Sequence, residues 1–252
     1  MSETRPRRRP PWRILGIAAA AAVVLLAVLA LLVWTGVLWP NRVAADRYAV
    51  RGVDVSAYQG EIDWPVLAAE DLDFAFVKAT EGSEHVDERF AANWEGARST
   101  DLLVGAYHFL SFESPGADQA AHMIDVVPAE SGTLPPVVDV EYYGEFADDP
   151  PSVDELRGIL DPMLDALEAH YGVPPVIYTT QQLRGAYLGD DYDRYPLWIR
   201  SVASTPGLPR RDWEFWQYSD RDTLPGYAGE ENHVDMNVFD GTLADLRALT
   251  QP

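Results

Sequence analysis

Short apolar segments alternate with amphipathic ones from about residue 51 to the end of the chain. The apolar segments are rich in β-branched and aromatic residues and end in polar or turn-forming residues, so they predict strands. The predicted strands are residues 52–56, 74–80, 103–109, 136–141, 175–179, 197–199, 213–218 and 234–239. Helical patterns separate the first five: one starts near Asp63, and the others cover residues 87–99, 116–127 and 152–170.

The second half of this region lacks comparable helices until a short one over residues 242–249. Strands that alternate with helices favour a parallel sheet, and eight of them favour a closed barrel. About 200 residues is at the small end for such a barrel. We therefore predict an α/β fold, an irregular TIM-like β/α barrel whose helices are reduced in its C-terminal part.

A continuous apolar segment without charge covers residues 14–39. About 20 apolar residues span a bilayer, and the basic residues 1–13 favour a cytoplasmic N-terminus. The alternative is a cleavable signal peptide, since Val43-Ala44-Ala45 resembles a cleavage site, but the apolar segment is long for one. We favour a single-pass signal anchor at 14–39, a linker at 40–50 and one extracytoplasmic catalytic domain at 51–252.

Charge is distributed unevenly between these parts. The net charge of the chain is -21, and residues 1–46 hold six arginines against Glu3 and Asp46, so the remainder carries a net charge of about -25. Such an acidic body disfavours nucleic acid as a partner. The chain has no cysteine and its five histidines lack metal-site spacing, so we expect no metal and no cofactor.

Two carboxylates, Asp139 and Glu141, close the predicted strand that follows Pro135-Pro136. Strand side chains alternate between faces, so both point to one side, with their Cα atoms about 6.6 Å apart. Like charges this close raise one pKa, and a protonated carboxyl beside an ionised one is what glycosidic bond cleavage requires. An isolated pair of this kind is more often two solvated acids at the end of a strand.

Other strands also end in polar or aromatic residues, which strengthens the interpretation of the pair as a site. In a β/α barrel the active site lies at the C-terminal strand ends. The candidates there are Asp54, Lys78, Tyr107, His108, Asp139, Glu141, Tyr178, Trp198, Gln217, Tyr218 and Asp235. Some of these have simpler explanations: Asp54 as a turn cap, Lys78 as a partner of an acid, and Trp198 as a core residue. Because Tyr107 and His108 are adjacent, only one of them can face inward.

These segments resemble the family 25 glycoside hydrolases, the Chalaropsis-type lysozymes. The matching blocks are Gly52–Ser56, Phe76–Gly82, Val104–Phe109, Pro136–Glu141, Trp216–Ser219 and Val234–Asn237. The resemblance implies an irregular barrel and hydrolysis of the β-1,4 bond between N-acetylmuramic acid and N-acetylglucosamine in peptidoglycan. It also implies that Glu141 is the general acid, beside Asp139, and that Asp54 and Asp235 complete the catalytic acids.

The six remaining candidates form the expected substrate-binding set, once His108 is set aside: Tyr107, Lys78, Tyr178, Trp198, Gln217 and Tyr218. Two mechanisms stay open. A carboxylate nucleophile needs its carboxyl group about 5–5.5 Å from that of the acid, whereas in substrate assistance the 2-acetamido group attacks and Asp139 orients it. We favour substrate-assisted retaining catalysis, because Asp139 and Glu141 share one face of a strand.

The chain departs from the family pattern after Leu197-Trp198-Ile199. The family commonly continues with alanine and then tyrosine, whereas this chain has Arg200-Ser201-Val202. This difference concerns one wall of the saccharide cleft and not the acid pair. We expect peptidoglycan glycan strands as the partner of a monomeric catalytic domain on the outer face of the membrane. The alternative is a non-catalytic peptidoglycan-binding or scaffold protein.

Overall fold

The computed structural model describes residues 11–34, 39–208, 212–229 and 231–252. The chain divides into two units, Met1–Trp39 and Pro40–Pro252, which are described separately. The first contains helix α1 (Pro11–Trp34). Its segment Ile14–Val33 is the one helix in the described residues that is long and apolar enough to cross a membrane, a test that a signal sequence also passes. The predicted span continued to residue 39, and residues 35–38 lie outside the described part.

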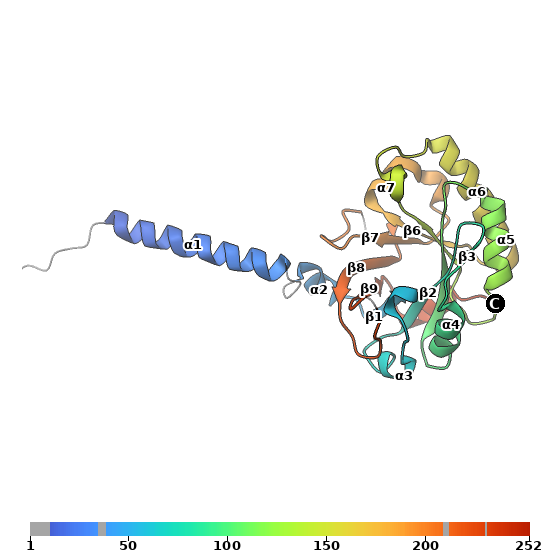
Figure 1. The fold of residues 1–252 in the computed structure, drawn as a ribbon, viewed down its shortest axis with the longest axis horizontal. Coiled ribbons are helices and arrows are strands. Elements are labelled where there is room, and N and C mark those ends of the chain that lie inside the picture. The colour runs from blue at the N-terminus through green and yellow to red at the C-terminus, as the bar shows by residue number, and fades with distance from the viewer. Residues whose placement is uncertain (1–10, 35–38, 209–211, 230) are drawn as a thin grey trace, which may run out of the picture. The chain divides into compact units, whose positions relative to one another are not determined.

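The second unit is built around a closed ring of eight strands (Figure 1). Their order is β1-β9-β8-β7-β6-β5-β4-β2, and β1 pairs with β2 to close the ring. The strands are β1 (Val50–Val55), β2 (Phe74–Glu81), β4 (Leu103–Phe109), β5 (Val137–Val140), β6 (Val176–Thr180), β7 (Leu197–Arg200), β8 (Phe215–Asp222) and β9 (Val234–Phe239). A short β3 (His85–Val86) extends β2 as a hairpin. The predicted α/β barrel is confirmed.

Helices cover the outside of the barrel in its first half. They are α3 (Trp64–Leu67), α4 (Phe90–Arg98), α5 (Gly116–Val126), α6 (Val153–Tyr171) and α7 (Gln181–Tyr187), with short 3-10 turns at Ala57–Gln59, Gly144–Ala147 and Asp190–Tyr192. Between β7 and β9 the described residues contain no α-helix, and α8 (Leu243–Ala248) ends the fold. Figure 1 shows α4, α5 and α6 along one side of the strands. The predicted loss of helices in the C-terminal part is therefore confirmed.

Aromatic rings fill the barrel interior. Phe76 stacks on Trp198 with ring centroids 4.7 Å apart, and Phe74 and Phe215 pack edge-on beside them. Glycine at two inward positions makes room for these rings: a Cβ on Gly52 would lie 2.5 Å from the Phe74 ring, and one on Gly105 would lie 2.5 Å from the Phe76 ring. This packing makes a solid floor, so any ligand cavity must lie above it, toward one end of the strands.

The direction of β9 differs from the expected parallel arrangement. It runs antiparallel to both β1 and β8, whereas the other neighbours in the ring are parallel. The start of β9 therefore lies beside the C-terminal ends of the other strands. Asp235, the second residue of β9, is the register partner of Asp54 near the end of β1. The reversal brings Asp235 to the same end of the barrel as the other predicted acids.

The prediction that residues 40–50 form a linker is incorrect. Helix α2 (Pro40–Ala45) belongs to the second unit, and Ala45 is fully buried there. Asn41 is also buried, and its amide Nδ2 donates to the carbonyl oxygens of Ser201 at 2.8 Å and Tyr218 at 3.1 Å. An amide side chain from an earlier segment of the chain therefore donates to two buried carbonyl oxygens of the barrel.

Replacement of Asn41 by alanine is expected to lower the free energy of unfolding by about 2 kcal/mol, because it removes the buried hydrogen bonds to the carbonyl oxygens of Ser201 and Tyr218. Guanidinium unfolding of Asn41→Ala, in a chain that begins at Pro40, measures this loss. The matched control is Val43→Ala on the same helix, whose side chain is 76% exposed and whose loss should cost less than about 0.5 kcal/mol. Equal effects of the two substitutions would show that α2 is not anchored through Asn41.

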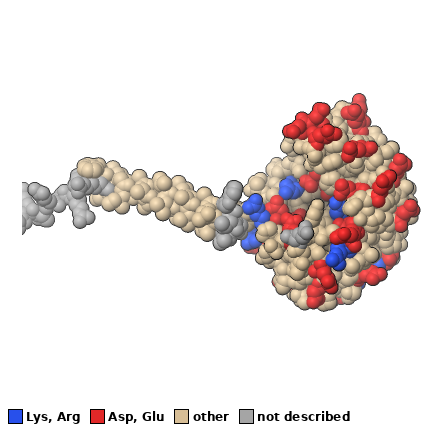
Figure 2. Space-filling model, viewed as in Figure 1, with Lys and Arg blue, Asp and Glu red and all other residues tan. Residues whose placement is uncertain are grey.

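Acidic side chains are spread over the visible surface of the second unit, with few basic ones among them (Figure 2). Several of the basic residues are paired, for example Arg42 with Asp222 at 2.7 Å and Arg98 with Glu130. This distribution fits the negative net charge of the chain. It offers no continuous basic face for a polyanion on the side shown.

Candidate active site

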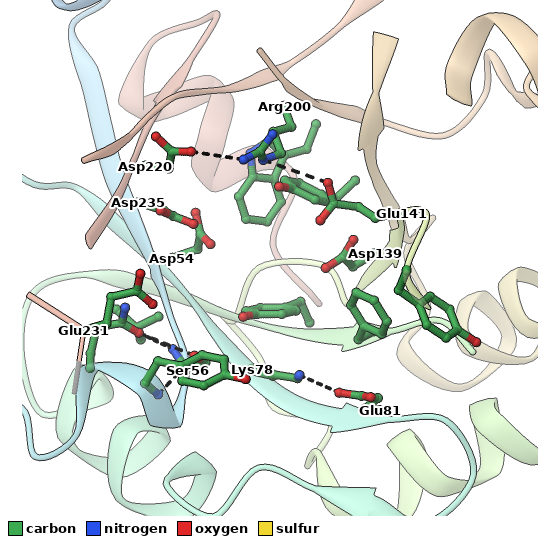
Figure 3. Close-up of a pocket in the computed structure, with 18 residues that line it drawn as sticks. Asp54, Ser56, Lys78, Glu81, Asp139, Glu141, Arg200, Asp220, Glu231 and Asp235 are labelled. Atoms are coloured by element: carbon green, nitrogen blue, oxygen red, sulfur yellow. Dashed lines mark hydrogen bonds and ion pairs between the residues drawn. The ribbon is translucent and has the colours of Figure 1, made fainter. Parts of the chain in front are cut away.

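A cavity of about 520 Å³ opens at the C-terminal end of the barrel strands (Figure 3). Acids from several separate strands reach it, and Figure 3 shows them on its walls. The predicted residues that line it are Asp54, Lys78, Tyr107, Asp139, Glu141, Tyr178, Trp198 and Asp235. Eight of the ten predicted site residues are therefore brought together by the fold.

One wall of the cavity holds the Asp54–Asp235 pair. Oδ2 of Asp54 accepts hydrogen bonds from the amide groups of Asn237 at 2.7 Å and Gln217 at 2.9 Å. Gln217 also donates to Oδ2 of Asp235 at 2.9 Å, so one amide group bridges the two carboxyl groups. Two carboxyl groups that share a site do not both ionise freely, so one of them favours its protonated form.

The surroundings of the two acids differ, and they favour the proton on Asp235. Burial raises the pKa of both, and the charge of Asp54 helps to raise the pKa of Asp235 to about 9. The amide donors favour the ionised form of Asp54. Asp235 therefore keeps its proton up to a pH of about 9, and the amide donors favour the charge on Asp54.

This pair is expected to make the folded protein less stable as the pH rises. Between the ordinary aspartate pKa of 3.8 and about 9, folded Asp235 holds a proton that the unfolded chain has lost, so the free energy of unfolding falls across this interval. We expect the melting temperature to fall between pH 5.5 and 8.5, and Asp235→Asn to reduce that fall by about 3 °C or more. Exposed Asp71 provides the control Asp71→Asn, which should leave the slope unchanged. A slope that Asp235→Asn leaves unaltered would contradict the assigned protonation.

The opposite wall holds Asp139 and Glu141, at the end of β5. They share one face of the strand as predicted, and the cavity is lined by both. Burial, followed by the charges of Glu141 and Asp54, raises the pKa of Asp139 well above its ordinary value. Its Oδ1 is buried without a hydrogen-bond partner among the described residues. An unpaired acceptor of this kind is suited to an N–H donor supplied by a ligand.

Glu141 is less enclosed than Asp139, with its side chain 26% exposed. Burial raises its pKa, and the Asp54 charge adds to the rise, while nearby Arg200 opposes it. The Arg200 Nε lies 3.9 Å from the Glu141 Oε1. A carboxyl group with a raised pKa that solvent and ligand can reach is suited to donate a proton.

The aromatic and basic side chains complete the cavity. Lys78 pairs with Glu81 at 2.7 Å and lies 5.3 Å from the centre of the Phe109 ring. The Tyr178 hydroxyl donates to Gln217, and Trp198 donates to the side-chain oxygen of Asn237. Trp198 is 2% exposed, so it forms the floor of the cavity more than a wall.

Two predicted substrate-binding residues lie elsewhere. Gln217 is 1% exposed and lies behind the acids, where its amide links Asp54, Asp235 and Tyr178. Tyr218 is buried in the core outside the barrel, against Trp216 with ring centroids 5.9 Å apart. The prediction that these two side chains face the substrate cleft is therefore incorrect for both.

His108 is also away from the cavity, which settles the choice between it and Tyr107. It is fully buried and hydrogen-bonded to Thr80 at 2.8 Å and Gln119 at 3.0 Å. Burial lowers its pKa to about 4, so it is neutral at physiological pH. Tyr107 is the inward-facing residue of the two.

The cavity also contains residues that were not predicted: Ser56, Tyr58, Gln59, Glu81, Phe109, Tyr143, Arg200, Asp220 and Glu231. Irregular pairing explains two of them. A bulge in β2 between Lys78 and Thr80 moves Glu81 to the inner face, and a bulge in β8 after Gln217 does the same for Asp220. Phe109 was detectable, since it ends the predicted strand 103–109 on its inward face. Arg200 follows the predicted strand 197–199, and the sequence had marked it only as a departure from the family pattern at one wall of the cleft.

Within the described residues, no three histidine, aspartate or glutamate side chains are grouped so as to hold a metal ion. The arrangement instead gathers four carboxyl groups with raised pKa values in one cavity. Carboxyl groups of this kind are suited to general acid–base chemistry. Fold and cavity together are typical of a barrel enzyme whose active site lies at the C-terminal strand ends.

Comparison with known proteins gives the family. A model of glycosyl hydrolases family 25 matches residues 53–227. A solved family 25 glycosyl hydrolase from Bacillus anthracis is 45% identical, with a TM-score of 0.76, and the match covers 81% of this chain and 94% of that one. A bacterial lysozyme structure from Streptomyces coelicolor is 32% identical, with a TM-score of 0.73, covering 80% and 96%. Lysozyme M1 of Streptomyces globisporus is 32% identical over 81% of this chain and 72% of its own length.

The chain therefore belongs to glycosyl hydrolases family 25. It is a glycoside hydrolase, and the family resemblance inferred from the sequence motifs is confirmed. The matched region contains Asp54, Asp139 and Glu141, and it ends before Asp235.

Proposed function

We propose that this protein is a peptidoglycan muramidase that hydrolyses the β-1,4 bond between N-acetylmuramic acid and N-acetylglucosamine. The observation that carries the proposal is the pair of carboxyl groups on one face of the β5 end, both with a raised pKa, in a cavity walled by further acids. The names of two similar proteins, lysozymes from Streptomyces species, support peptidoglycan as the substrate.

Glu141 is proposed as the general acid. Its carboxyl group donates a proton to the glycosidic oxygen as the bond to the anomeric carbon breaks. Burial and the Asp54 charge favour the protonated form that this step requires. The resulting carboxylate then removes a proton from the water that attacks the anomeric carbon in the second step.

Asp139 is proposed to orient the 2-acetamido group of the substrate. In substrate-assisted catalysis the acetamido oxygen attacks the anomeric carbon from the face opposite to the leaving group. The unpaired Oδ1 of Asp139 is a suitable acceptor for the acetamido N–H. As positive charge develops on the acetamido group, the Asp139 carboxylate stabilises it by accepting the N–H hydrogen bond and then the N–H proton. Two successive displacements give retention of configuration.

Asp54 and Asp235 are proposed to support this chemistry from the other wall. Ionised Asp54 is among the groups that raise the pKa of both Asp139 and Glu141. Tyr107, Lys78, Tyr178 and Trp198 are proposed to contact the sugar, because aromatic faces pack on sugar rings and polar groups bind hydroxyls. Phe109 and Tyr143 extend the aromatic lining.

We also propose that the catalytic unit acts outside the membrane. Residues 1–13 would remain in the cytoplasm, residues 14–39 would span the bilayer, and the body would face the cell wall as a monomer. The support is the apolar helix Ile14–Val33 and the five arginines that precede it in the sequence. Because α2 is part of the body, the extracytoplasmic domain would begin at Pro40 and not at residue 51.

The products of digestion test the proposed activity. Purified peptidoglycan is incubated with the chain from Pro40 to Pro252, the new reducing ends are reduced with borohydride, and the sugar alcohols are identified after acid hydrolysis. A muramidase gives the alcohol of muramic acid. Glucosaminitol would instead show cleavage of the other glycosidic bond. Tight binding with no new reducing ends would establish a binding protein in its place.

A further inference from the structure

An arginine lies on the cavity wall directly beside the proposed general acid. Arg200 is the last residue of β7, and its Nε lies 3.9 Å from the Glu141 Oε1. Its Nη2 donates to the Asp220 Oδ2 at 3.1 Å. Figure 3 shows Arg200 between these two carboxyl groups. The side chain is 35% exposed, so it faces the cavity and is not part of the core.

The position of Arg200 is fixed by structure on both sides. Asp220 holds the outer end of the guanidinium, and β7 is in register with β8 through the pair Arg200–Gln217. The next residue, Ser201, is held from behind, because its carbonyl accepts hydrogen bonds from Asn41 at 2.8 Å and from the Trp216 ring at 3.0 Å. A guanidinium with this support has little freedom to leave the carboxyl group that it faces.

We propose that Arg200, held by Asp220, is a positioning residue that fixes the Glu141 carboxyl on the cavity wall and sets the pH range in which Glu141 can act as an acid. This inference rests on the proposed function. It goes beyond the proposed function because it adds a positioning residue that acts on the reaction through Glu141.

The charges around the guanidinium support this role. Arg200 faces Glu141 from the end of β5, Asp220 from β8, Asp235 from β9 and Tyr178 from β6. It lowers the pKa of Glu141, Asp139, Asp54 and Asp235, in each case against the effect of burial. The other cation of the cavity, Lys78, is paired with Glu81 at 2.7 Å and is not among the groups that affect Glu141.

The direction of the effect follows from the charges. A positive charge beside Glu141 favours its ionised form, so Arg200 limits the rise of its pKa. A general acid works only while it is protonated, so activity declines as the pH rises through this pKa. Removal of the Arg200 charge is therefore expected to shift the alkaline limb of the pH–activity profile to higher pH. The shift expected for an opposite charge at this distance is about one pH unit.

The test compares three variants of the full-length protein in detergent, assayed on peptidoglycan from pH 4 to pH 10. Arg200→Gln removes the charge, Arg200→Lys retains it, and Arg184→Gln removes an arginine outside the cavity as a control. We expect the alkaline limb of the kcat/KM profile to shift to higher pH by about one pH unit in Arg200→Gln and in neither of the other two variants. The proposal would be overturned if the limb of Arg200→Gln stayed in place or shifted to lower pH, or if Arg184→Gln showed the same shift to higher pH.

A direct titration separates this inference from the proposed function. The protein is labelled with ¹³C at glutamate carboxyl groups, and the Glu141 signal is assigned by its absence in Glu141→Gln. Its pKa is expected to rise by about one unit in Arg200→Gln relative to the unsubstituted chain. An unchanged pKa would refute the role of Arg200 even if peptidoglycan is hydrolysed. Failure of the unsubstituted chain to hydrolyse peptidoglycan would count against the proposed function, while the titration would still decide the role of Arg200.

Discussion

Glu141→Gln is expected to lower kcat for peptidoglycan hydrolysis by about 10²- to 10⁴-fold, the contribution typical of a general acid. Glutamine keeps the size of the side chain but cannot donate an acidic proton to the leaving oxygen. The side chain is partly exposed and makes one long ion pair among the described residues, so the fold should be retained. Initial rates of reducing-end release, with melting curves for both proteins, measure the effect.

The matched control for this loss is Glu145→Gln. Glu145 is exposed on the 3-10 turn after β5 and does not line the cavity. Glu145→Gln is the same chemical change close to the same strand end, and its effect on the rate should be less than about twofold. If Glu141→Gln retained more than about a tenth of the activity, the assignment of the acid would have to be abandoned.

Asp139→Asn is expected to give the second-largest loss, about 10²- to 10³-fold in kcat, because the amide can neither ionise nor accept the acetamido proton. Asp139 is 7% exposed and its Oδ1 has no partner, so the amide is accommodated without the loss of a known hydrogen bond. Initial rates with and without azide measure the role of the residue. Substrate assistance predicts that azide does not restore activity.

A different result with azide would change the mechanism. Rescue of Asp139→Asn with a glycosyl-azide product would show that the variant lacks a carboxylate nucleophile or base. Glu81→Gln provides a comparison, since Glu81 also lines the cavity but pairs with Lys78 at the end of β2, two strands along the ring from β5. Its rate loss should be clearly smaller than that of Asp139→Asn.

Local sequence signals predicted most of the fold. The strands at 103–109 and 234–239 have the predicted bounds. The long helix begins at Val153 with the capping box formed by Ser152 and Glu155, in which the serine oxygen accepts from the Glu155 N–H at 3.3 Å. These features depend on residues a few positions apart, so a single sequence reveals them.

Features that depend on distant parts of the chain could not be read in the same way. The direction of β9 is set by its pairing with β1 and β8, and its own sequence pattern is the same in either direction. The integration of α2 depends on carbonyl groups of Ser201 and Tyr218, about 160 residues later. The short α7 was not predicted; it begins where the Thr180 hydroxyl accepts from the Leu183 N–H.

In the candidate site, too, local sequence patterns were predictive, and features that depend on distant parts of the chain were not predicted. Alternation along one strand predicted that Asp139 and Glu141 share a face, and both line the cavity. Alternation left the choice between Tyr107 and His108 open. Gln217 was predicted from its place near a strand end, but its amide is buried behind the acids. Bulges shift the alternation, so Glu81 and Asp220 became visible only in the folded sheet.

The configuration of the freshly released product tests the central claim most directly. Proton NMR of the first products from a defined peptidoglycan oligosaccharide identifies both the new reducing sugar and its anomeric form before the two anomers equilibrate. The proposed action of Glu141 and Asp139 predicts N-acetylmuramic acid reducing ends that appear first as the β-anomer, and none from Glu141→Gln. An α-anomer formed first would contradict the retaining mechanism, and N-acetylglucosamine reducing ends would contradict the muramidase activity itself.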